Sequence, residues 1–320
     1  MRAALITSFA GPDAVTVQDV AEPVRAEGEV VIDVEYAGVS FPDVLQTRGE
    51  YQLRPALPFV PGWEVAGIVR EGNGGFHRGD RVAAMPIVGG FAQRVAAPST
   101  MTFALPESVP LDVAAAVLLN YLTAEFALRR RGRLQHGETV LVHGAAGGVG
   151  SATCQLAAAL GARVIAVVST PEKGDVARQS GAHHVVTVDG FRDQVRSITG
   201  QRGVDVVVDP VGGDRFVDSL RCLAPEGRLL VVGFAGRDIP TVKVNRLLLT
   251  NTSVTGVAVA EMWAAEPGYV QEQWQAVRPL LESGAISPRI GAVHSLNHVS
   301  DALREVDERR SRGKVVLAIH

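Results

Sequence analysis

Three glycines spaced three residues apart, Gly144, Gly147 and Gly150, carry the clearest chemical signal in the sequence. They follow an apolar segment, residues 139–142, and open a run of small apolar residues with the composition of a helix. Glycines in such a turn permit unusual dihedrals and let a pyrophosphate approach the helix N-terminus. A second apolar segment, residues 164–168, completes the start of a βαβ unit. The pattern predicts a dinucleotide site. The residues expected at the cofactor in this turn are Ala146, Gly147, Gly148 and Val149.

The end of the second strand bears on which nicotinamide cofactor is bound. An NAD site normally places an acidic residue there for the ribose hydroxyls, whereas this sequence has Ser169. A carboxylate would repel a 2′-phosphate, while a hydroxyl and an ammonium group would hold it. Ser169 and Lys173 are therefore expected to contact that phosphate, and NADPH is the expected cofactor, although Glu172 lies nearby. The alternative is that Ser169 caps the next helix and Lys173 is a solvated surface charge.

Composition narrows the class of protein. The chain has 320 residues, enough for two domains, and a net charge of −3 without a basic stripe, which argues against a nucleic-acid partner. No apolar run approaches the roughly 20 residues that span a bilayer, and the N-terminus reads as a strand rather than a signal peptide. Cys154 and Cys222 fall on predicted helices and are interpreted as small buried hydrophobes. A cytoplasmic enzyme without a membrane partner is expected.

The order of apolar segments and turn signals predicts an α/β protein with two domains. Residues 1–117 are rich in strands and interrupted by prolines and glycines, whereas residues 118–259 alternate strand and helix. That alternation indicates a doubly wound parallel sheet. Residues 260–320 hold two helices and a closing strand, Lys314–Ile319, and are expected to return to the first domain. The strands predicted for the parallel sheet are 139–142, 164–168, 184–188, 204–209, 228–233 and 253–259.

Several segments in sequence order carry a resemblance to a known family. They are Ala37–Tyr51, Pro61–Gly67, Leu119–Ala124, His143–Gly150, Val208–Gly213 and Val231–Phe234. The chain resembles the zinc-independent quinone oxidoreductase-like group of the medium-chain dehydrogenase/reductase superfamily. The resemblance implies a β-rich GroES-like catalytic domain together with a Rossmann domain.

Departures from the zinc enzymes of that superfamily constrain the chemistry. At the two first-domain positions that resemble metal ligands of those enzymes, this sequence has Ser40 and Trp63. Two cysteines cannot form a four-cysteine zinc lobe. No catalytic metal is expected. Hydride transfer to a simple ketone creates a localised alkoxide that a Lewis acid would stabilise. A quinone or an α,β-unsaturated carbonyl spreads that charge, so hydrogen-bond donors and one proton source suffice.

The resemblance also implies roles for single residues. Tyr51 is expected to act as proton donor or substrate positioner, or alternatively to pack a loop. Ser40 is expected near the nicotinamide ribose. Asn120 and Thr123 are placed at the start of a helix, meeting the cofactor or capping the helix. Lys314 is expected to reach the cofactor, with a surface lysine as the alternative. The remaining cofactor residues, at the carboxyl ends of sheet strands, are Val211, Gly233 and Phe234.

These observations favour an NADPH-dependent reductase of quinones or of the activated double bond of α,β-unsaturated carbonyl compounds. An enoyl-CoA (enoyl thioester) reductase is the alternative within the class, and Arg48, Arg54 and Arg94 are available for such a substrate. A non-catalytic NADPH-binding structural or sensor protein is the alternative of another class. The segment 253–259 is expected at the sheet edge, where its pairing with a second copy would give a homodimer.

Overall fold

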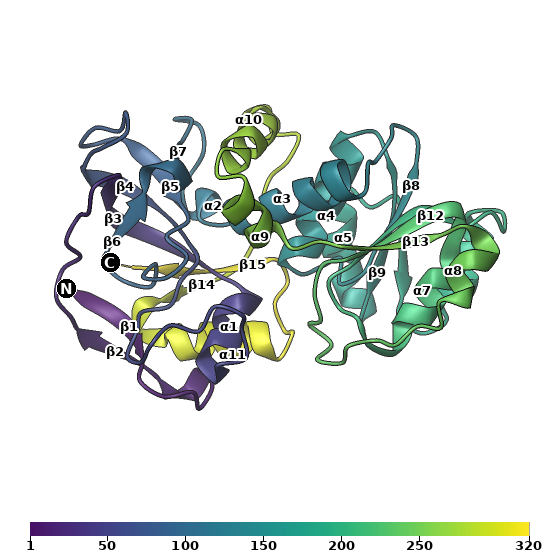
Figure 1. Cartoon of the computed structure of the whole chain (residues 1–320), viewed down its shortest axis with the longest axis horizontal. Coiled ribbons are helices and arrows are strands. Elements are labelled where there is room, and N and C mark those ends of the chain that lie inside the picture. The colour runs from purple at the N-terminus through teal and green to yellow at the C-terminus, as the bar shows by residue number, and fades with distance from the viewer. Residues whose placement is uncertain (320) are drawn as a thin grey trace. The chain divides into compact units, whose positions relative to one another are not determined.

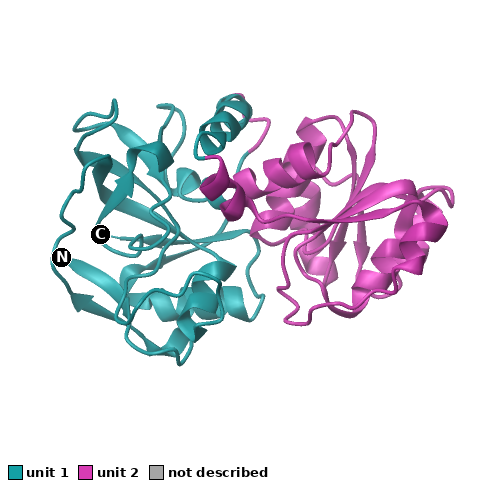
Figure 2. Ribbon diagram, in the orientation of Figure 1, with its two compact units in different colours: residues 1–119, 267–282, 287–320 teal, residues 120–266, 283–286 magenta. Residues whose placement is uncertain are grey.

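The computed structural model describes residues 1–319, which divide into two compact units (Figure 2). The first unit comprises residues 1–119, 267–282 and 287 to the end of the described chain. The second comprises residues 120–266 and 283–286. The domain bounds drawn from the sequence, 117/118 and 259/260, lie a few residues from these junctions. The short excursion at 283–286 has no counterpart in the sequence-based division.

The first unit is built on a mixed sheet in the order β14-β15-β3-β4-β5-β7, with β6 paired to β3 and a separate β1–β2 hairpin (Figure 1). Its strands are β1 Arg2–Ile6, β2 Val15–Asp19, β3 Glu29–Val39, β4 Glu64–Glu71, β5 Arg81–Ala84, β6 Arg94–Pro98, β7 Thr102–Ala104, β14 Ile290–Ser295 and β15 Lys314–Ala318. Its helices are α1 Phe41–Arg48, α2 Leu111–Ala114, α10 Tyr269–Glu282 and α11 Val299–Asp307.

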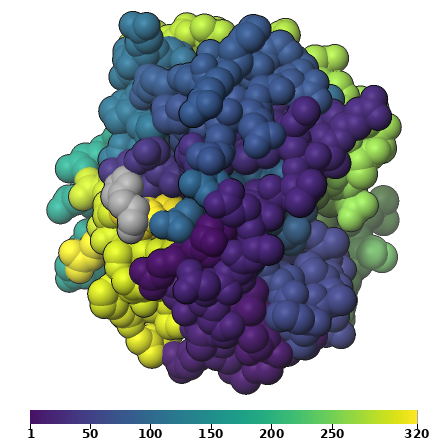
Figure 3. All heavy atoms as spheres, turned by 90° about the vertical axis from the view of Figure 1, so that its left-hand side faces the viewer, coloured from purple at the N-terminus to yellow at the C-terminus, as the bar shows by residue number. Residues whose placement is uncertain are grey.

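The closing strand and the helix before it lie in the first unit, whereas residues 260–266 and 283–286 lie in the second. β15 lies between β14 and β3, pairing antiparallel to β3 with Val316 opposite Gly38. The helix α11 packs near β2, where the Ser300 hydroxyl donates to the carbonyl of Val15 at 3.1 Å. Figure 3 shows residues from the two ends of the chain side by side on one face of this unit. The unit therefore depends on contacts between segments nearly the whole chain apart.

The second unit is a doubly wound parallel sheet in the order β10-β9-β8-β11-β12-β13 (Figure 1). Its strands are β8 Thr139–Val142, β9 Arg163–Val168, β10 His184–Thr187, β11 Val204–Asp209, β12 Leu223–Val231 and β13 Ser253–Gly256. Its helices are α4 Gly148–Ala159, α5 Gly174–Gln179, α6 Phe191–Ile198, α7 Phe216–Cys222, α8 Asn245–Thr250 and α9 Val259–Ala265; α3, Leu118–Glu125, spans the first junction. The strand order reverses between β8 and β11, which is where this fold binds its ligands.

The central strands of this sheet are apolar throughout because helices cover both of their faces. Leu141, Ile165 and Val207 are fully buried and belong to one core that extends to Phe191 and Leu229. Cys154 and Cys222 are both free and buried, as predicted. The continuous apolar runs recognised in the sequence thus mark the strands that end at the reversal of strand order.

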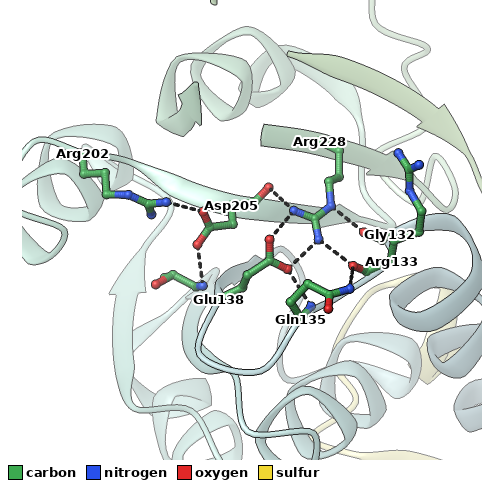
Figure 4. A network of polar contacts seen from close by, with 8 residues as sticks. Gly132, Arg133, Gln135, Glu138, Arg202, Asp205 and Arg228 are labelled. Atoms are coloured by element: carbon green, nitrogen blue, oxygen red, sulfur yellow. Dashed lines mark hydrogen bonds and ion pairs between the residues drawn. The ribbon is translucent and has the colours of Figure 1, made fainter. Parts of the chain in front are cut away.

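A network of hydrogen bonds and ion pairs joins residues at the amino-terminal side of β8, β11 and β12 (Figure 4). The guanidinium of Arg228 donates to both carboxylate oxygens of Glu138, at 2.7 and 2.6 Å, and to the carbonyls of Gly132 and Arg133. Asp205 accepts the backbone N–H of Thr139 at 2.8 Å. The network joins β8, β11 and β12 at the sheet edge opposite the glycine turn.

Several sequence-based element positions need correction. β12 begins at Leu223 rather than at 228, and β10 ends at Thr187 rather than at 188. β12 ends at Val231, so Gly233 and Phe234 lie in the loop beyond it rather than in the strand. β13 ends at Gly256, since residues from Val259 onward form α9. Asn120 and Thr123 lie inside α3 rather than at its start, so the alternative that they cap this helix is wrong. Short or locally weak elements such as β7, β14 and α1 are not predicted at all.

Candidate functional site

The glycine turn of the second unit forms a cradle at the carboxyl end of β8. Gly144 has a φ of 58°, in the left-handed region that favours glycine, and its carbonyl accepts the N–H of Gly147 at 2.9 Å. A Cβ at Gly150 would lie 2.1 Å from the Gly144 carbonyl oxygen, so only glycine allows α4 to pack against the turn. Gly144 and Gly150 are therefore required by the fold itself.

Gly147 differs from its two neighbours in the motif. Its φ is −88°, and a Cβ there would have only the Gly144 carbonyl oxygen nearby, at 3.4 Å, an ordinary contact distance. Folding alone therefore leaves room for a side chain at this position. Gly147 is the residue before α4, and no side chain caps the N–H groups that open this helix. The bare backbone and the helix dipole together fit an approaching pyrophosphate.

Asn120 lies directly against this turn. Its side chain is buried, and a Cβ at Gly148 would lie 2.6 Å from Asn120 Nδ2. Asn120 and Gly148, both predicted cofactor residues, are thus brought together, and Thr123 is buried one turn further along α3. Ala146 is buried, whereas Gly148 and Val149 are half-buried at the start of α4.

The end of β9 presents a hydroxyl group and a cation. Ser169 is exposed immediately after the strand, and Lys173 is half-buried in the following 3₁₀ turn, Pro171–Lys173. The N-cap of that turn is Thr170, so the alternative that Ser169 caps the next helix is wrong. No carboxylate stands at the strand end itself. This arrangement fits a 2′-phosphate better than a free ribose hydroxyl.

The carboxyl end of β11 is held by Asp209, a residue that the sequence analysis did not single out. Its Oδ1 accepts the N–H groups of Val211 and Gly212, both at 2.9 Å, and its side chain is 1% exposed. The loop after β12 bonds back to this segment: the N–H of Ala235 donates to Pro210 and that of Gly236 to Val211. Half-buried Gly233 and partly exposed Phe234 belong to the same loop.

Beneath the turn lies a buried histidine. His143 is fully buried, and its Nε2 lies 2.7 Å from the hydroxyl of Ser219. Burial lowers the pKa of His143 to about 4, opposed by the charge of Asp209, so the ring is neutral at physiological pH. His143 therefore supports the turn without adding a charge.

A second group of predicted residues meets inside the first unit. Lys314 Nζ donates to Ser40 Oγ at 2.6 Å and to Glu64 Oε1, and Lys314 is only 4% exposed. The alternative that Lys314 is a surface lysine is therefore wrong. Glu64 also accepts the N–H of Leu119 at 3.0 Å through Oε2. Sequence reasoning missed Glu64 because its partner lies 250 positions away.

Asp43 completes this buried cluster. Its Oδ2 accepts the N–H of Ser40 at 2.8 Å, while Oδ1 has no hydrogen-bond partner among residues 1–319. Burial raises the pKa of Asp43 to about 7, and the negative charge of Glu64 adds to the shift, whereas the Ser40 N–H and the charge of Lys314 oppose it.

Tyr51 packs edge-on against Trp63, with ring centroids 5.4 Å apart. Tyr51 is half-buried and lines an open depression with Gly49, Glu50, Gln52 and Arg54. The structure thus places the predicted catalytic tyrosine at a surface that a ligand can reach, against the ring of Trp63.

Residues 1–319 contain neither a metal-binding cluster nor a membrane-spanning helix. In that part of the chain, no three His, Cys, Asp or Glu side chains gather as a metal site would require. No helix there combines the length and apolar character needed to cross a bilayer.

The reversal of strand order, the glycine turn and the uncapped helix behind it define a dinucleotide-binding protein of the Rossmann class. Comparisons with known proteins refine this class. Residues 26–107 match the family model described as alcohol dehydrogenase GroES-like domain, and residues 148–283 match that described as zinc-binding dehydrogenase.

Individual relatives cover nearly the whole chain. Quinone oxidoreductase-like protein 2 of Mus musculus is 39% identical, covering 99% of this chain and 92% of that protein. A probable oxidoreductase from Mycobacterium abscessus is 42% identical with a TM-score of 0.92, covering 100% of this chain and 99% of that one. The quinone oxidoreductase of Thermus thermophilus, solved alone and with NADPH, is 35% identical with a TM-score of 0.89 and full coverage of both chains. The chain belongs to the quinone oxidoreductase-like group of the medium-chain dehydrogenase/reductase superfamily.

Proposed function

We propose that this protein is an NADPH-dependent oxidoreductase that reduces quinones or the activated double bond of α,β-unsaturated carbonyl compounds, without zinc. The observation that carries the proposal is the cradle at Gly147, a position that the fold would allow to hold a side chain but that is left bare beside an uncapped helix N-terminus. The complex of the Thermus thermophilus relative with NADPH supports the choice of cofactor.

The residues of the second unit would hold NADPH by complementary charge and shape. The backbone of Ala146–Val149 would receive the pyrophosphate, and Ser169 with Lys173 the 2′-phosphate. Asn120, Thr123, Val211, Gly233 and Phe234 would line the remainder of the site, with Asp209 fixing the loop that carries Val211. Bound NADPH supplies a hydride to the acceptor.

Charge pairing in the first unit favours a small acceptor over a CoA thioester. Arg48 is paired with Asp307, and Arg94 with Asp33 and Glu22. Arg54, the third arginine available for a CoA phosphate, lies over the ring of Phe9 at 5.4 Å and donates to the carbonyl of Gly49. Carboxylates thus neutralise two of the three cations. Only Arg54, beside Tyr51, has no carboxylate partner among residues 1–319 and remains to bind a CoA diphosphate.

Ser40 and Trp63 support a reaction without zinc. They occupy the two positions that resemble metal ligands of the zinc enzymes, and an indole N–H cannot coordinate a metal. A conjugated acceptor delocalises the charge that hydride transfer creates, so hydrogen bonds suffice to stabilise it.

Two further proposals concern assembly and location. The edge strand β13 and the exposed apolar residues of α8 fit pairing with a second copy of the chain, giving a homodimer. Both thiols are free and buried, which fits the reducing conditions of the cytoplasm.

A screen of NADPH oxidation against quinones, enones, enoyl-CoA esters and simple ketones tests the proposed function. Turnover is expected with quinones or enones. Tight NADPH binding without turnover of any acceptor would instead favour a non-catalytic NADPH-binding protein. Lys173→Ala is expected to weaken NADPH binding about tenfold and leave NADH binding unchanged; equal losses for both cofactors would contradict the phosphate contact.

A further inference from the structure

The first unit holds two buried hydrogen-bond donors for which residues 1–319 provide no acceptor. Trp63 is 3% exposed, and its Nε1 has no hydrogen-bond partner among those residues. Ser40 is 6% exposed, and its Oγ acts only as an acceptor, from Lys314. A buried N–H without a partner costs about 1–3 kcal/mol, so such a group indicates a missing acceptor.

Both residues lie at the same end of one strand pair. Gly38 of β3 lies opposite Glu64 of β4, so Ser40 and Trp63 come just beyond the end of this antiparallel ladder. Only glycine fits at position 38, because a Cβ there would lie 2.6 Å from Glu64 Oε1 and 2.2 Å from the carbonyl oxygen of Ala115. The glycine thus lets Glu64 and its partner Lys314 pack directly behind Ser40.

Lys314 determines what the Ser40 hydroxyl can do. An ammonium group only donates, so its hydrogen bond of 2.6 Å occupies a lone pair of Ser40 Oγ. The hydroxyl proton of Ser40 is therefore directed away from Lys314. Both oxygens of Glu64 already accept hydrogen bonds, from Lys314 and from Leu119, and Asp43 Oδ1 has no partner among residues 1–319. The proton remains available for an external acceptor.

We infer that Ser40 Oγ–H and Trp63 Nε1–H form an oxyanion site that receives the carbonyl oxygen of the acceptor, with Lys314 as the positioning residue that orients and polarises Ser40. The inference deepens the proposed function by naming the groups that bind the oxygen of a quinone or enone. A buried cation behind the hydroxyl strengthens its hydrogen bond to a negative oxygen. Tyr51, packed on Trp63, would hold the indole in place.

A phenolate tests this site without requiring turnover. The probe is 4-nitrophenol, titrated at pH values on either side of its own pKa, with and without NADP⁺. The protein is expected to bind the phenolate more tightly than the phenol. Ser40→Ala and Trp63→Phe are each expected to reduce this preference about 10-fold to 100-fold, since each removes a hydrogen bond to a charged oxygen. Ser40→Thr, which keeps a hydroxyl, is expected to retain it.

Matched variants separate loss of a donor from loss of structure. Ser180→Ala removes a buried hydroxyl of the second unit, and Trp274→Phe removes a buried indole of the first unit. Both variants are expected to keep the preference for the phenolate. Trp63→Phe leaves a ring packed on Tyr51, so it tests the site even if Ser40→Ala fails to fold. Lys314→Met combined with Glu64→Gln removes both buried charges together and is expected to weaken the preference with both donors intact.

The outcomes distinguish this inference from the proposed function. An unchanged phenolate preference in both Ser40→Ala and Trp63→Phe would overturn the oxyanion site, even if NADPH-dependent quinone reduction is found. A preference that depends on both residues would support the site even if every acceptor fails as a substrate. In an active protein, the same two variants are expected to lower kcat about 100-fold, and Trp63→Phe is expected to leave the Kd for NADPH unchanged.

Discussion

At the scale of single residues, the buried charges of the first unit decide how the protein responds to pH. Glu64 and Lys314 neutralise each other, whereas Asp43 beside them accepts only backbone N–H groups. Removing a carboxyl group from water disfavours its charged form, so ionisation of Asp43 lowers the free energy of unfolding.

Asp43→Asn should reveal this cost. The pKa of Asp43 is raised from 3.8 to about 7, so wild-type stability from this group is fully present below about pH 4 and is lost as the pH rises through 7. Three pKa units correspond to about 4 kcal/mol. Relative to wild type, Asp43→Asn should therefore gain up to about that amount between pH 4 and pH 8, measured by denaturant unfolding. A difference independent of pH would contradict the assignment.

Sequence reasoning found some of these residues but not their relationships. Ser40 and Trp63 were recognised because they occupy the positions that resemble metal ligands of the zinc enzymes, and Lys314 because it begins the closing strand. Glu64, Asp43 and Asp209 gave no local signal, since an acidic residue in a strand or an early helical turn is usually solvated. Their roles depend on strand register and on contacts across the chain, which no local pattern encodes.

At the scale of elements, the strand–turn–helix at residues 139–159 separates two uses of glycine. Gly150→Ala should destabilise the protein by several kcal/mol, because its Cβ would lie 2.1 Å from the Gly144 carbonyl oxygen. Gly147→Ala should leave the unfolding midpoint nearly unchanged and weaken NADPH binding about tenfold or more, since the methyl group faces the incoming pyrophosphate. Thermal unfolding and cofactor titration of both variants check this. Equal effects of the two changes on stability would contradict the distinction.

The opposite edge of the same sheet should affect stability alone. Arg228→Met removes the cation paired with Glu138 and the donor to the carbonyls of Gly132, Arg133 and Asp205, at a cost of about 2–4 kcal/mol in free energy of unfolding (Figure 4). Arg202→Met is the matched control, because that arginine is 61% exposed and its ion pair with Asp205 should contribute under about 1 kcal/mol. NADPH affinity should not change in either variant. A fall in NADPH affinity on Arg228→Met would show that this edge is coupled to the cofactor site.

Element prediction succeeded where apolar runs are long and continuous. The sequence-based bounds of β8 and β11 coincide with the structure, because strands buried on both faces are apolar throughout. It failed for β14, whose residues alternate between half-buried and exposed, and for the ends of β12 and β13, where apolar residues continue into loops and α9.

At the scale of the whole molecule, the second unit exposes an apolar surface next to its edge strand. Leu248 and Leu249 of α8 are 77% and 78% exposed, and Val244 and Ile239 nearby are 75% and 71% exposed. Exposed apolar residues beside an edge strand are typical of a subunit interface. The wild-type chain should have the mass of a dimer in solution. The double change Leu248→Glu and Leu249→Glu should give a monomer.

Light scattering after size-exclusion chromatography measures this mass. Val24→Glu, at a residue of the first unit that is 89% exposed, is the control and should leave the dimer intact. A wild-type monomer, or a dimer that survives both charged substitutions on α8, would place the interface elsewhere or exclude it.

Reduction of conjugated acceptors without zinc is tested by NADPH oxidation with a chelator-treated, metal-free preparation, comparing a quinone or enone with a simple ketone. We expect the conjugated acceptor to be reduced at the same rate before and after metal removal, and the ketone not to be reduced. Activity that disappears with the metal and returns with added zinc, or reduction of the ketone alone, would contradict it.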